Sequence, residues 1–360
     1  MMEKTEFQQK LLQYGIDGMM GACIAVGTRL RLFEALAKVG NQSNPATPAQ
    51  VADESGCKER YVREWLAALG TGGIISVTED EKFFIKQEDV KDLTCTPELL
   101  SISFLPNFLR PYEKLCSVIK KEGPPGLDYA DYTTECFEVI DRLSEALHKD
   151  HLVTDFIPAL GPDMKERLEK GKMLCLDIGC GKGLHAFHLA QCFPNSKFIG
   201  IDSSFDAIRL AKKRRDENSN KIDNLYFMQM NGSKMDPSWN NAFDMAMIFD
   251  ACHDQTRPDL CMKEIYRVLK PGGVFGMVEI HGTSSIYQDK KEDGAMAAMY
   301  YGYSLLHCLP VGSNSEDALC LGAMWGDKRG LELLKDAGFS EVTVQNPPYL
   351  PHSALYICKK

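Results

Sequence analysis

The feature that most constrains the fold is a glycine-rich stretch in the middle of the chain. Residues 172–183 read Lys-Met-Leu-Cys-Leu-Asp-Ile-Gly-Cys-Gly-Lys-Gly, so an apolar run ends in three glycines spaced two apart. This pattern predicts a buried parallel strand that enters a tight turn, followed by a helix over 184–192. Strand, glycine turn and helix form the first half of a nucleotide-binding unit, in which the backbone approaches a ligand closely.

An acidic residue ahead of the turn narrows the choice of ligand. Asp177 lies two residues before Gly179, where the pyrophosphate of a dinucleotide would meet unfavourable charge. S-adenosylmethionine has no phosphate and brings an ammonium and a sulfonium, which a carboxylate favours. The third glycine, Gly183, also comes one residue early for the G-x-G-x-x-G dinucleotide fingerprint, and bulky Leu184 follows it. These residues favour S-adenosylmethionine over a nicotinamide dinucleotide.

At this stretch the chain resembles the class I S-adenosylmethionine-dependent methyltransferases, whose first motif is an acid followed by G-x-G-x-G. The resemblance implies an α/β fold with a Rossmann-like seven-stranded sheet. After residue 161 strands and helices alternate regularly, which also predicts a doubly wound sheet. Strands are expected near 174–178, 197–202, 225–230, 243–249 and 274–280, and two more near 341–345 and 354–358.

The ends of these strands supply the predicted cofactor site. Asp202 ends the second strand and follows Gly181 by 21 residues, the expected spacing for an acid that accepts both ribose hydroxyls. The resemblance places adenine recognition after the third strand, where many members carry an acid and this chain has Asn231. The residues expected to contact S-adenosylmethionine are Asp177, Gly179, Gly181, Asp202, Ser203, Asn231, Gly232 and Phe249.

His253 is the candidate general base, because histidine titrates near neutral pH and this one follows the fourth strand. The block from Cys252 to Cys261 resembles the C-H-D-W-x-D-x-x-C block of plant phenolic O-methyltransferases, which implies the same role, although Gln255 replaces the tryptophan. Glu279, at the end of the fifth strand, is expected to orient or charge-stabilise His253, and His281 is a second candidate base. A hydrogen-bonding role at a strand end remains the alternative for His253 and Glu279.

The N-terminal part predicts a mostly helical, winged-helix-like domain. Helical patterning over 6–39 is followed by a capping box, Thr47-Pro48-Ala49-Gln50, then by a helix over 58–69 and a hairpin over 74–85. The predicted wing reads Glu-Asp-Glu and the net charge is −9, which argues against DNA binding. The layout resembles small-molecule O-methyltransferases of plants and bacteria, which implies a dimerisation domain over 1–92, a helical linker over 93–165 and a catalytic domain over 166–360.

Composition bounds the class of protein. A chain of 360 residues is long enough for two domains, and neither a membrane span nor a signal peptide is evident. The 13 cysteines form no C-x-x-C pair, so reduced thiols in the cytoplasm are expected, with no metal site.

His148 and His151 lack a third ligand and are predicted to be surface or helix-end residues. The basic run at 212–215 is interpreted as a solvated helix end.

Together these observations predict a homodimeric methyltransferase that uses S-adenosylmethionine and acts on a hydroxyl, thiol or ring nitrogen of a small molecule. Neither nucleic acid nor membrane is expected as a partner. The alternatives are a winged-helix transcriptional regulator that binds S-adenosylmethionine without turnover, and a protein methyltransferase, for which no substrate-docking region is evident. Residues 284–326 form an insertion rich in Met and Tyr that is either core or a lid over the acceptor.

Overall fold

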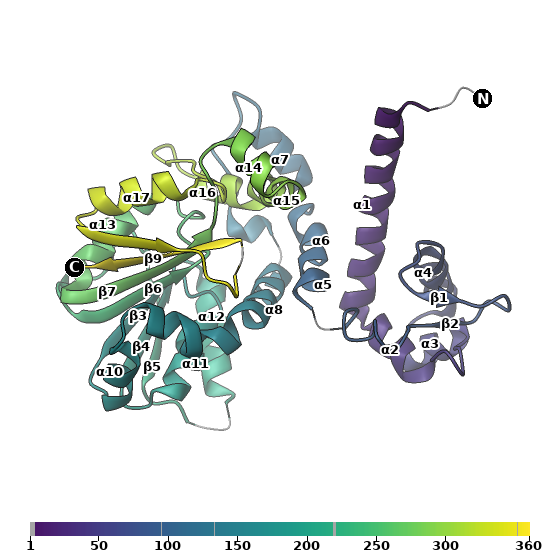
Figure 1. Cartoon of the computed structure of the whole chain (residues 1–360), viewed down its shortest axis with the longest axis horizontal. Helices are drawn as coiled ribbons and strands as arrows, with labels where there is room; N and C mark the ends of the chain where they lie inside the picture. Colours follow the sequence, from purple (N-terminus) through teal and green to yellow (C-terminus); the bar gives the residue numbers. More distant parts are fainter. Residues whose placement is uncertain (1–3, 95, 133, 219–220, 351) are drawn as a thin grey trace. The chain divides into compact units, whose positions relative to one another are not determined.

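The computed structural model describes residues 4–94, 96–132, 134–218, 221–350 and 352–360. The chain forms two compact units, one up to Leu109 and the other from Arg110 onward (Figure 1). The helices of the predicted linker divide between the two units: α5 (Pro97–Ile102) and α6 (Phe104–Phe108) belong to the first. None of the described helices combines the length and the apolar character needed to cross a membrane.

The first unit has the winged-helix arrangement that the sequence predicts. The helical stretch over 6–39 is two helices, because Arg31 between them adopts a left-handed φ of 55°. The capping box is present: the Thr47 hydroxyl accepts from the Gln50 backbone N–H at 3.3 Å, and the Gln50 side chain accepts from the Thr47 N–H at 2.8 Å. The elements are α1 (Glu6–Leu30), α2 (Leu32–Val39), α3 (Pro48–Ser55), α4 (Glu59–Thr71) and the antiparallel strands β1 (Ser76–Val77) and β2 (Phe83–Phe84).

An aromatic pair joins three helices in the core of this unit. Trp65 of α4 packs edge-on against Phe33 of α2 with ring centroids 5.1 Å apart. The indole N–H of Trp65 donates to the carbonyl of Cys23 in α1 at 2.9 Å, so its polar atom is satisfied inside an apolar core. Burial of apolar side chains on α2, α3 and α4 therefore holds the unit together.

The second unit is built on a seven-stranded sheet of order β5-β4-β3-β6-β7-β9-β8. The first five strands in this order are parallel, and β9 runs antiparallel to both β7 and β8. The predicted Rossmann-like sheet is thereby confirmed. The strands are β3 (Leu174–Ile178), β4 (Lys197–Asp202), β5 (Leu225–Gln229), β6 (Phe243–Phe249), β7 (Leu269–Ile280), β8 (Glu341–Gln345) and β9 (Ser353–Lys359).

Helices cover both faces of this sheet (Figure 1). Successive side chains of a strand point to opposite faces, so Met245 and Met247 of β6 join one core while Ala246 and Ile248 join the other. The first core is covered by α10 (Met164–Lys170), α11 (Leu184–Cys192) and α12 (Phe205–Asp216), and the second by α13 (Pro258–Val268) and α17 (Asp327–Asp336).

The remaining elements follow in chain order. Before β3 come α7 (Tyr112–Val118), η1 (Tyr129–Asp131), α8 (Thr134–His151), the π-helical η2 (Leu152–Phe156) and α9 (Ile157–Ala159). Among them, η2 and α9 add Leu152, Phe156 and Ile157 to the first core. The short η3 (Pro237–Trp239) precedes β6. The insertion over 284–326 is mostly helical, with α14 (Ile286–Glu292), α15 (Ala295–Tyr303), the π-helical η4 (Ser304–Cys308) and α16 (Leu309–Gly312).

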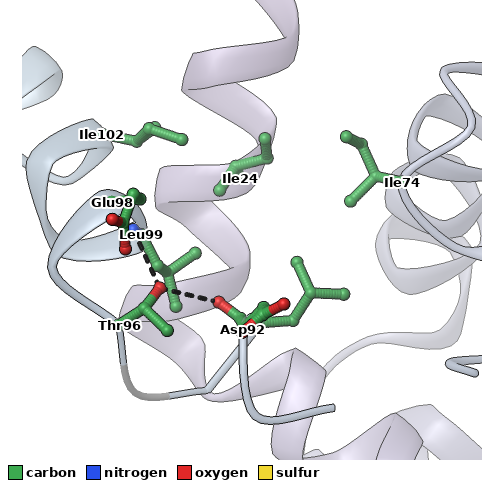
Figure 2. A pocket seen from close by; sticks show the side chains of 8 residues that line it. Ile24, Ile74, Asp92, Thr96, Glu98, Leu99 and Ile102 are labelled. Atoms are coloured by element: carbon green, nitrogen blue, oxygen red, sulfur yellow. Dashed lines mark hydrogen bonds between the residues drawn. The ribbon is translucent and has the colours of Figure 1, made fainter. Parts of the chain in front are cut away.

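A cavity of about 500 Å³ opens in the first unit beside α1 and α5 (Figure 2). Apolar side chains line most of it, and the hydroxyl of Thr96, one of its polar lining groups, is hydrogen-bonded within the chain. Thr96 Oγ1 donates to the carbonyl of Asp92 at 3.1 Å and accepts from the Leu99 N–H at 3.4 Å, which caps α5. This cavity is therefore a packing feature at the start of α5, and the chemistry of the chain lies in the second unit.

Candidate active site

The glycine turn after β3 adopts a conformation that requires glycine. Gly179, Gly181 and Gly183 have φ angles of 64°, 53° and 76°. A Cβ on Gly179 would lie 2.7 Å from the Cβ of Ala251, which follows β6. At Gly181 no other described residue comes within 4 Å of the Cβ position. The turn is therefore crowded against the end of β6 at its first glycine and open at its second.

Asp177 lies beneath this turn rather than on its surface. Its side chain is 2% exposed and accepts from the Ala186 N–H, in the first turn of α11, at 3.2 Å. Burial raises the pKa of Asp177 to about 8, because the charged form loses its hydration. A cation bound at the turn would favour the charged form again. Cofactor contact by Asp177 stays a prediction.

Asp202 connects the end of β4 to the glycine turn. Its carboxylate accepts from the Gly181 N–H at 2.9 Å and from the Ser204 N–H at 2.8 Å. Burial raises its pKa against the opposing effect of these two donors. Ser204 caps α12 by accepting from the Ala207 N–H, whereas the exposed Ser203 uses its carbonyl to accept from Gln229. The parallel pairing of β3 with β4 thus places the predicted ribose ligand at the turn.

The turn after β5 contains the other two predicted cofactor residues. Asn231 Oδ1 accepts from both the N–H and the hydroxyl of Ser233 at 2.8 Å, which fixes the turn locally. A Cβ on Gly232 would lie 3.1 Å from a side-chain atom of Ile178 and from Cys261 Sγ. Gly232 is therefore packed against the end of β3, close to the glycine turn.

Phe249, at the end of β6, belongs to a cluster of aromatic and histidine rings. Its ring stacks on His185 with centroids 3.8 Å apart, and His185 Nε2 lies 2.9 Å from His148 Nδ1. Both histidines are buried, and burial lowers the pKa of His148 to about 4. His148 lies in the last turn of α8, as predicted for a helix-end residue, but it is not a surface residue, because α8 packs its side chain against α11. His151 instead contacts Asp155 at 2.9 Å.

His253 and Glu279 form a buried pair at the carboxyl ends of β6 and β7. His253 Nδ1 contacts Glu279 Oε2, and Glu279 Oε1 accepts from the backbone N–H groups of Cys252 at 2.9 Å and His253 at 3.3 Å. Burial lowers the pKa of His253, but the charges of Glu279 and Asp254 outweigh it and hold this pKa well above its usual value. The two residues that the sequence singled out are thus in contact.

Two further residues extend this pair and were missed by sequence reasoning. Asp254 Oδ1 lies 3.3 Å from His253 Nε2, and Asp254 Oδ2 accepts from the Tyr129 hydroxyl at 2.6 Å. Asp254 was visible as part of the Cys-His-Asp block, whereas Tyr129 lies 125 residues earlier and carried no signal of its own. His281, the second candidate base, contacts Asp327 at 2.9 Å instead.

An ion-pair network ties the glycine turn to α8. Lys182 contacts Glu138 at 2.6 Å and Asp141 at 3.3 Å, and Arg214 donates to Asp141 at 2.8 Å and to the Lys182 carbonyl at 3.0 Å. The interpretation of 212–215 as a solvated helix end is therefore wrong for Arg214. Its side chain is only 21% exposed and donates to the carbonyl of Lys182 in the glycine turn. It remains apt for the exposed Lys212 and Lys213.

Comparison with known proteins identifies the fold. Residues 169–336 match the family model described as "Methyltransferase domain", and residues 18–94 match the "Rv2258c-like winged HTH domain". The chain carries a methyltransferase domain. Together with the seven-stranded sheet this confirms the resemblance to S-adenosylmethionine-dependent methyltransferases with a winged-helix domain.

Two curated relatives match within the methyltransferase domain. A demethylmenaquinone methyltransferase of Lactococcus lactis is 34% identical over 32% of this chain and 46% of its own length. A fatty-acid O-methyltransferase of Mycolicibacterium smegmatis is 32% identical over 28% of this chain and 34% of its own length. The matches therefore span less than half of each of these relatives.

Solved structures resemble the whole chain. A putative O-methyltransferase of Nostoc punctiforme superposes with a TM-score of 0.73, covering 99% of this chain and 100% of that chain at 15% identity. Human N-acetylserotonin methyltransferase in complex with SAM gives a TM-score of 0.68, covering 99% of both chains at 16% identity. At these identities the likeness establishes the fold.

Proposed function

We propose that the protein transfers a methyl group from S-adenosylmethionine to a hydroxyl, thiol or ring nitrogen of a small molecule. The observation that carries the proposal is the contact between the glycine turn and the segment of the His253–Glu279 pair. Gly179 abuts Ala251, which is two residues from His253. A ligand held on the turn would therefore lie near a buried, charge-paired imidazole.

The residues around the turn fit S-adenosylmethionine better than a dinucleotide. Asp177 is buried and Asp202 half-buried near the turn, and each loses hydration when charged. The ammonium and sulfonium of the cofactor would offset this cost, whereas a pyrophosphate would increase it. Asp202 is placed to accept from the ribose, and the open side of Gly181 leaves room for the ligand. When bound, the cofactor supplies a methyl group on an already activated leaving group.

The side chains then have distinct roles. Glu279 holds His253 through Nδ1, so Nε2 is the nitrogen that takes the proton of the acceptor. As that proton leaves, the acceptor lone pair forms the bond to the methyl carbon and the bond from sulfur to this carbon breaks. Since the pKa of His253 is raised, its basic form increases with pH above neutrality. A ring nitrogen without a proton requires alignment and desolvation only.

The test is calorimetric titration of the full chain with S-adenosylmethionine and, separately, with NADH. Acceptors from three classes, namely phenols, thiols and azoles, are then screened for release of S-adenosylhomocysteine. Micromolar binding of the first ligand alone, with release on one acceptor class, is expected. Binding without release on any acceptor would favour the regulator, and no binding would contradict the role given to the turn.

We also propose a homodimer in a reducing compartment, the cytoplasm. The helix α1 exposes apolar side chains that the rest of its unit leaves uncovered, including Phe7, Leu11, Tyr14 and Met19. The cysteines of the described residues are all free, as expected where thiols stay reduced. Light scattering on the purified chain tests the dimer, and a monomer at micromolar concentration would contradict it.

The match to a winged HTH domain favours the regulator as the second candidate function. The charges of α4 argue against it: Arg60 contacts Glu64 at 2.5 Å and Arg63 contacts Glu59 at 2.6 Å. Paired in this way, the two arginines bring little net positive charge to a phosphate backbone. DNA affinity with a steep salt dependence would reverse this preference.

A further inference from the structure

Three side chains of different chemistry converge beside the proposed base. His253, Asp254 and Cys308 each present one donor atom, and these atoms all lie within 4.8 Å of one another. His253 and Cys308 are buried, and the Asp254 side chain is 12% exposed. The first two follow β6, while Cys308 ends η4, a π-helical segment of a kind often found at functional sites. Imidazole, carboxylate and thiolate are the ligands that Zn²⁺ takes in proteins.

The distance between His253 and Asp254 is that of neighbouring ligands on one metal ion, and Cys308 Sγ lies within 4.8 Å of both. His253 Nε2 and Asp254 Oδ1 are 3.3 Å apart. In a tetrahedral zinc site with bonds of about 2.0–2.2 Å, neighbouring nitrogen and oxygen ligands lie roughly 3.3–3.5 Å apart. Asp254 Oδ1 is also buried, and within the described part of the chain it has no hydrogen-bond partner. A cation at this point would give this buried oxygen a ligand bond in place of its 3.3 Å contact with His253 Nε2.

The surrounding residues orient the ligands as supporting groups do in metal sites. His253 contacts Glu279 through Nδ1, which leaves Nε2 for a metal. Asp254 Oδ2 accepts from the Tyr129 hydroxyl at 2.6 Å, which leaves Oδ1 for the same metal. Two carboxylates face a single imidazole here, so a cation would also balance the charge of the cluster.

We propose that His253, Asp254 and Cys308 bind a zinc ion with a fourth position open, and that this ion inhibits methyl transfer by occupying His253 Nε2. Binding converts the Cys308 thiol to a thiolate and requires His253 Nε2 without its proton, so the thiol proton and the Nε2 proton of a charged His253 are both released to solvent. Zinc and the proton of the acceptor compete for one nitrogen, so bound metal and turnover exclude each other. The inhibition rests on the proposed function, whereas the binding does not.

The binding test uses the full chain freed of metal with a chelator and then dialysed. Calorimetry with Zn²⁺ and absorbance with Co²⁺ are expected to show one equivalent bound, with a thiolate-to-cobalt charge-transfer band. Cys308→Ser should abolish the band and weaken zinc binding at least about tenfold, and Tyr129→Phe should weaken it about tenfold. Cys320→Ser, at an exposed cysteine, should change neither. Unchanged zinc affinity in Cys308→Ser would overturn the site.

The inhibition test uses the acceptor found in the screen. Zinc should suppress wild-type turnover, and a chelator should restore it. In Cys308→Ser the zinc concentration that halves turnover, measured against that variant's own metal-free turnover, should rise at least about tenfold. If zinc binds in the one-equivalent manner but turnover is unaffected, the inhibition is wrong although the site stands. Unaltered S-adenosylmethionine affinity checks that Cys308→Ser is folded. Should that variant not fold, Asp254→Asn is the replacement, and undiminished zinc binding in it would equally overturn the proposal.

Discussion

The two units of the chain differ in whether they bury charged side chains. Among the described residues up to Leu109 no charged side chain is buried, and the arginines of α4 pair with glutamates at the surface. In the second unit Asp177, His253 and Glu279 are each at most 3% exposed. The described part of the first unit buries no ionisable side chain, whereas the second unit keeps ionisable groups inside the protein.

This difference in buried charge indicates that the second unit carries the function. An isolated buried charge costs several kcal/mol, so it persists only when it is paired or needed. Asp177, His253 and Glu279 lie at the carboxyl ends of β3, β6 and β7, the edge at which open parallel sheets bind ligands. Perturbed pKa values at such an edge favour chemistry, while the surface pairs of α4 favour a structural role for the first unit.

Removal of the candidate base His253 is expected to have the largest effect on turnover. His253→Ala is expected to lower turnover by about 10²- to 10⁴-fold, because general base catalysis contributes about that much. Affinity for S-adenosylmethionine should stay within about threefold, which calorimetry measures. Turnover that survives with an unchanged pH profile would remove His253 from the mechanism.

Neutralisation of Glu279, the partner of His253, is expected to have the second largest effect on turnover. In Glu279→Gln the burial of His253 is no longer offset by the Glu279 charge, so the pKa of His253 should fall from its raised value. The rise of kcat/KM with pH, expected above neutrality in the wild type, should shift to lower pH, with turnover roughly a hundredfold lower. Glu292→Gln, at an exposed glutamate of α14, is the control. Identical pH profiles in the two variants would show that Glu279 does not act through His253.

Asp202→Ala tests the cofactor side of the same edge. Hydrogen bonds to a charged group are worth about 1.5–3 kcal/mol, so S-adenosylmethionine should bind roughly ten- to a hundredfold more weakly. Calorimetry measures this directly. Asp206→Ala removes an exposed carboxylate from the first turn of α12 and should leave affinity unchanged. Equal affinity for S-adenosylmethionine in the two variants would contradict the role of Asp202 as the ribose ligand.

The smallest effect is expected in the first unit. The double change Arg60→Ala and Arg63→Ala removes two surface ion pairs, which should alter the free energy of unfolding by at most about 1 kcal/mol and leave turnover intact. Duplex DNA binding should be weak in the wild type and no weaker in the variant. If the wild type instead binds duplex DNA with a salt-dependent affinity that the variant loses, α4 is a DNA-binding surface.

The sequence by itself determined the local elements and their order. The glycine turn, the capping box of Thr47 and Gln50 and the strand that ends in Asp202 are all patterns between near neighbours. Backbone preferences and hydrophobic periodicity act over such short stretches, so they can be read without the fold. Even the contact of His253 with Glu279 followed, because adjacent parallel strands bring their ends together.

Only the tertiary structure decided what meets from distant segments. Packing of η1, α8 and η4 against the sheet edge brings Tyr129 to Asp254, buries His148 against His185 and places Cys308 beside His253. Arg214 likewise serves the glycine turn through Asp141 of α8. These contacts depend on how helices pack in three dimensions, a long-range effect that leaves no periodic signal at the residues concerned. The sequence therefore determined the turn and the position of the candidate base, and packing decided what surrounds them.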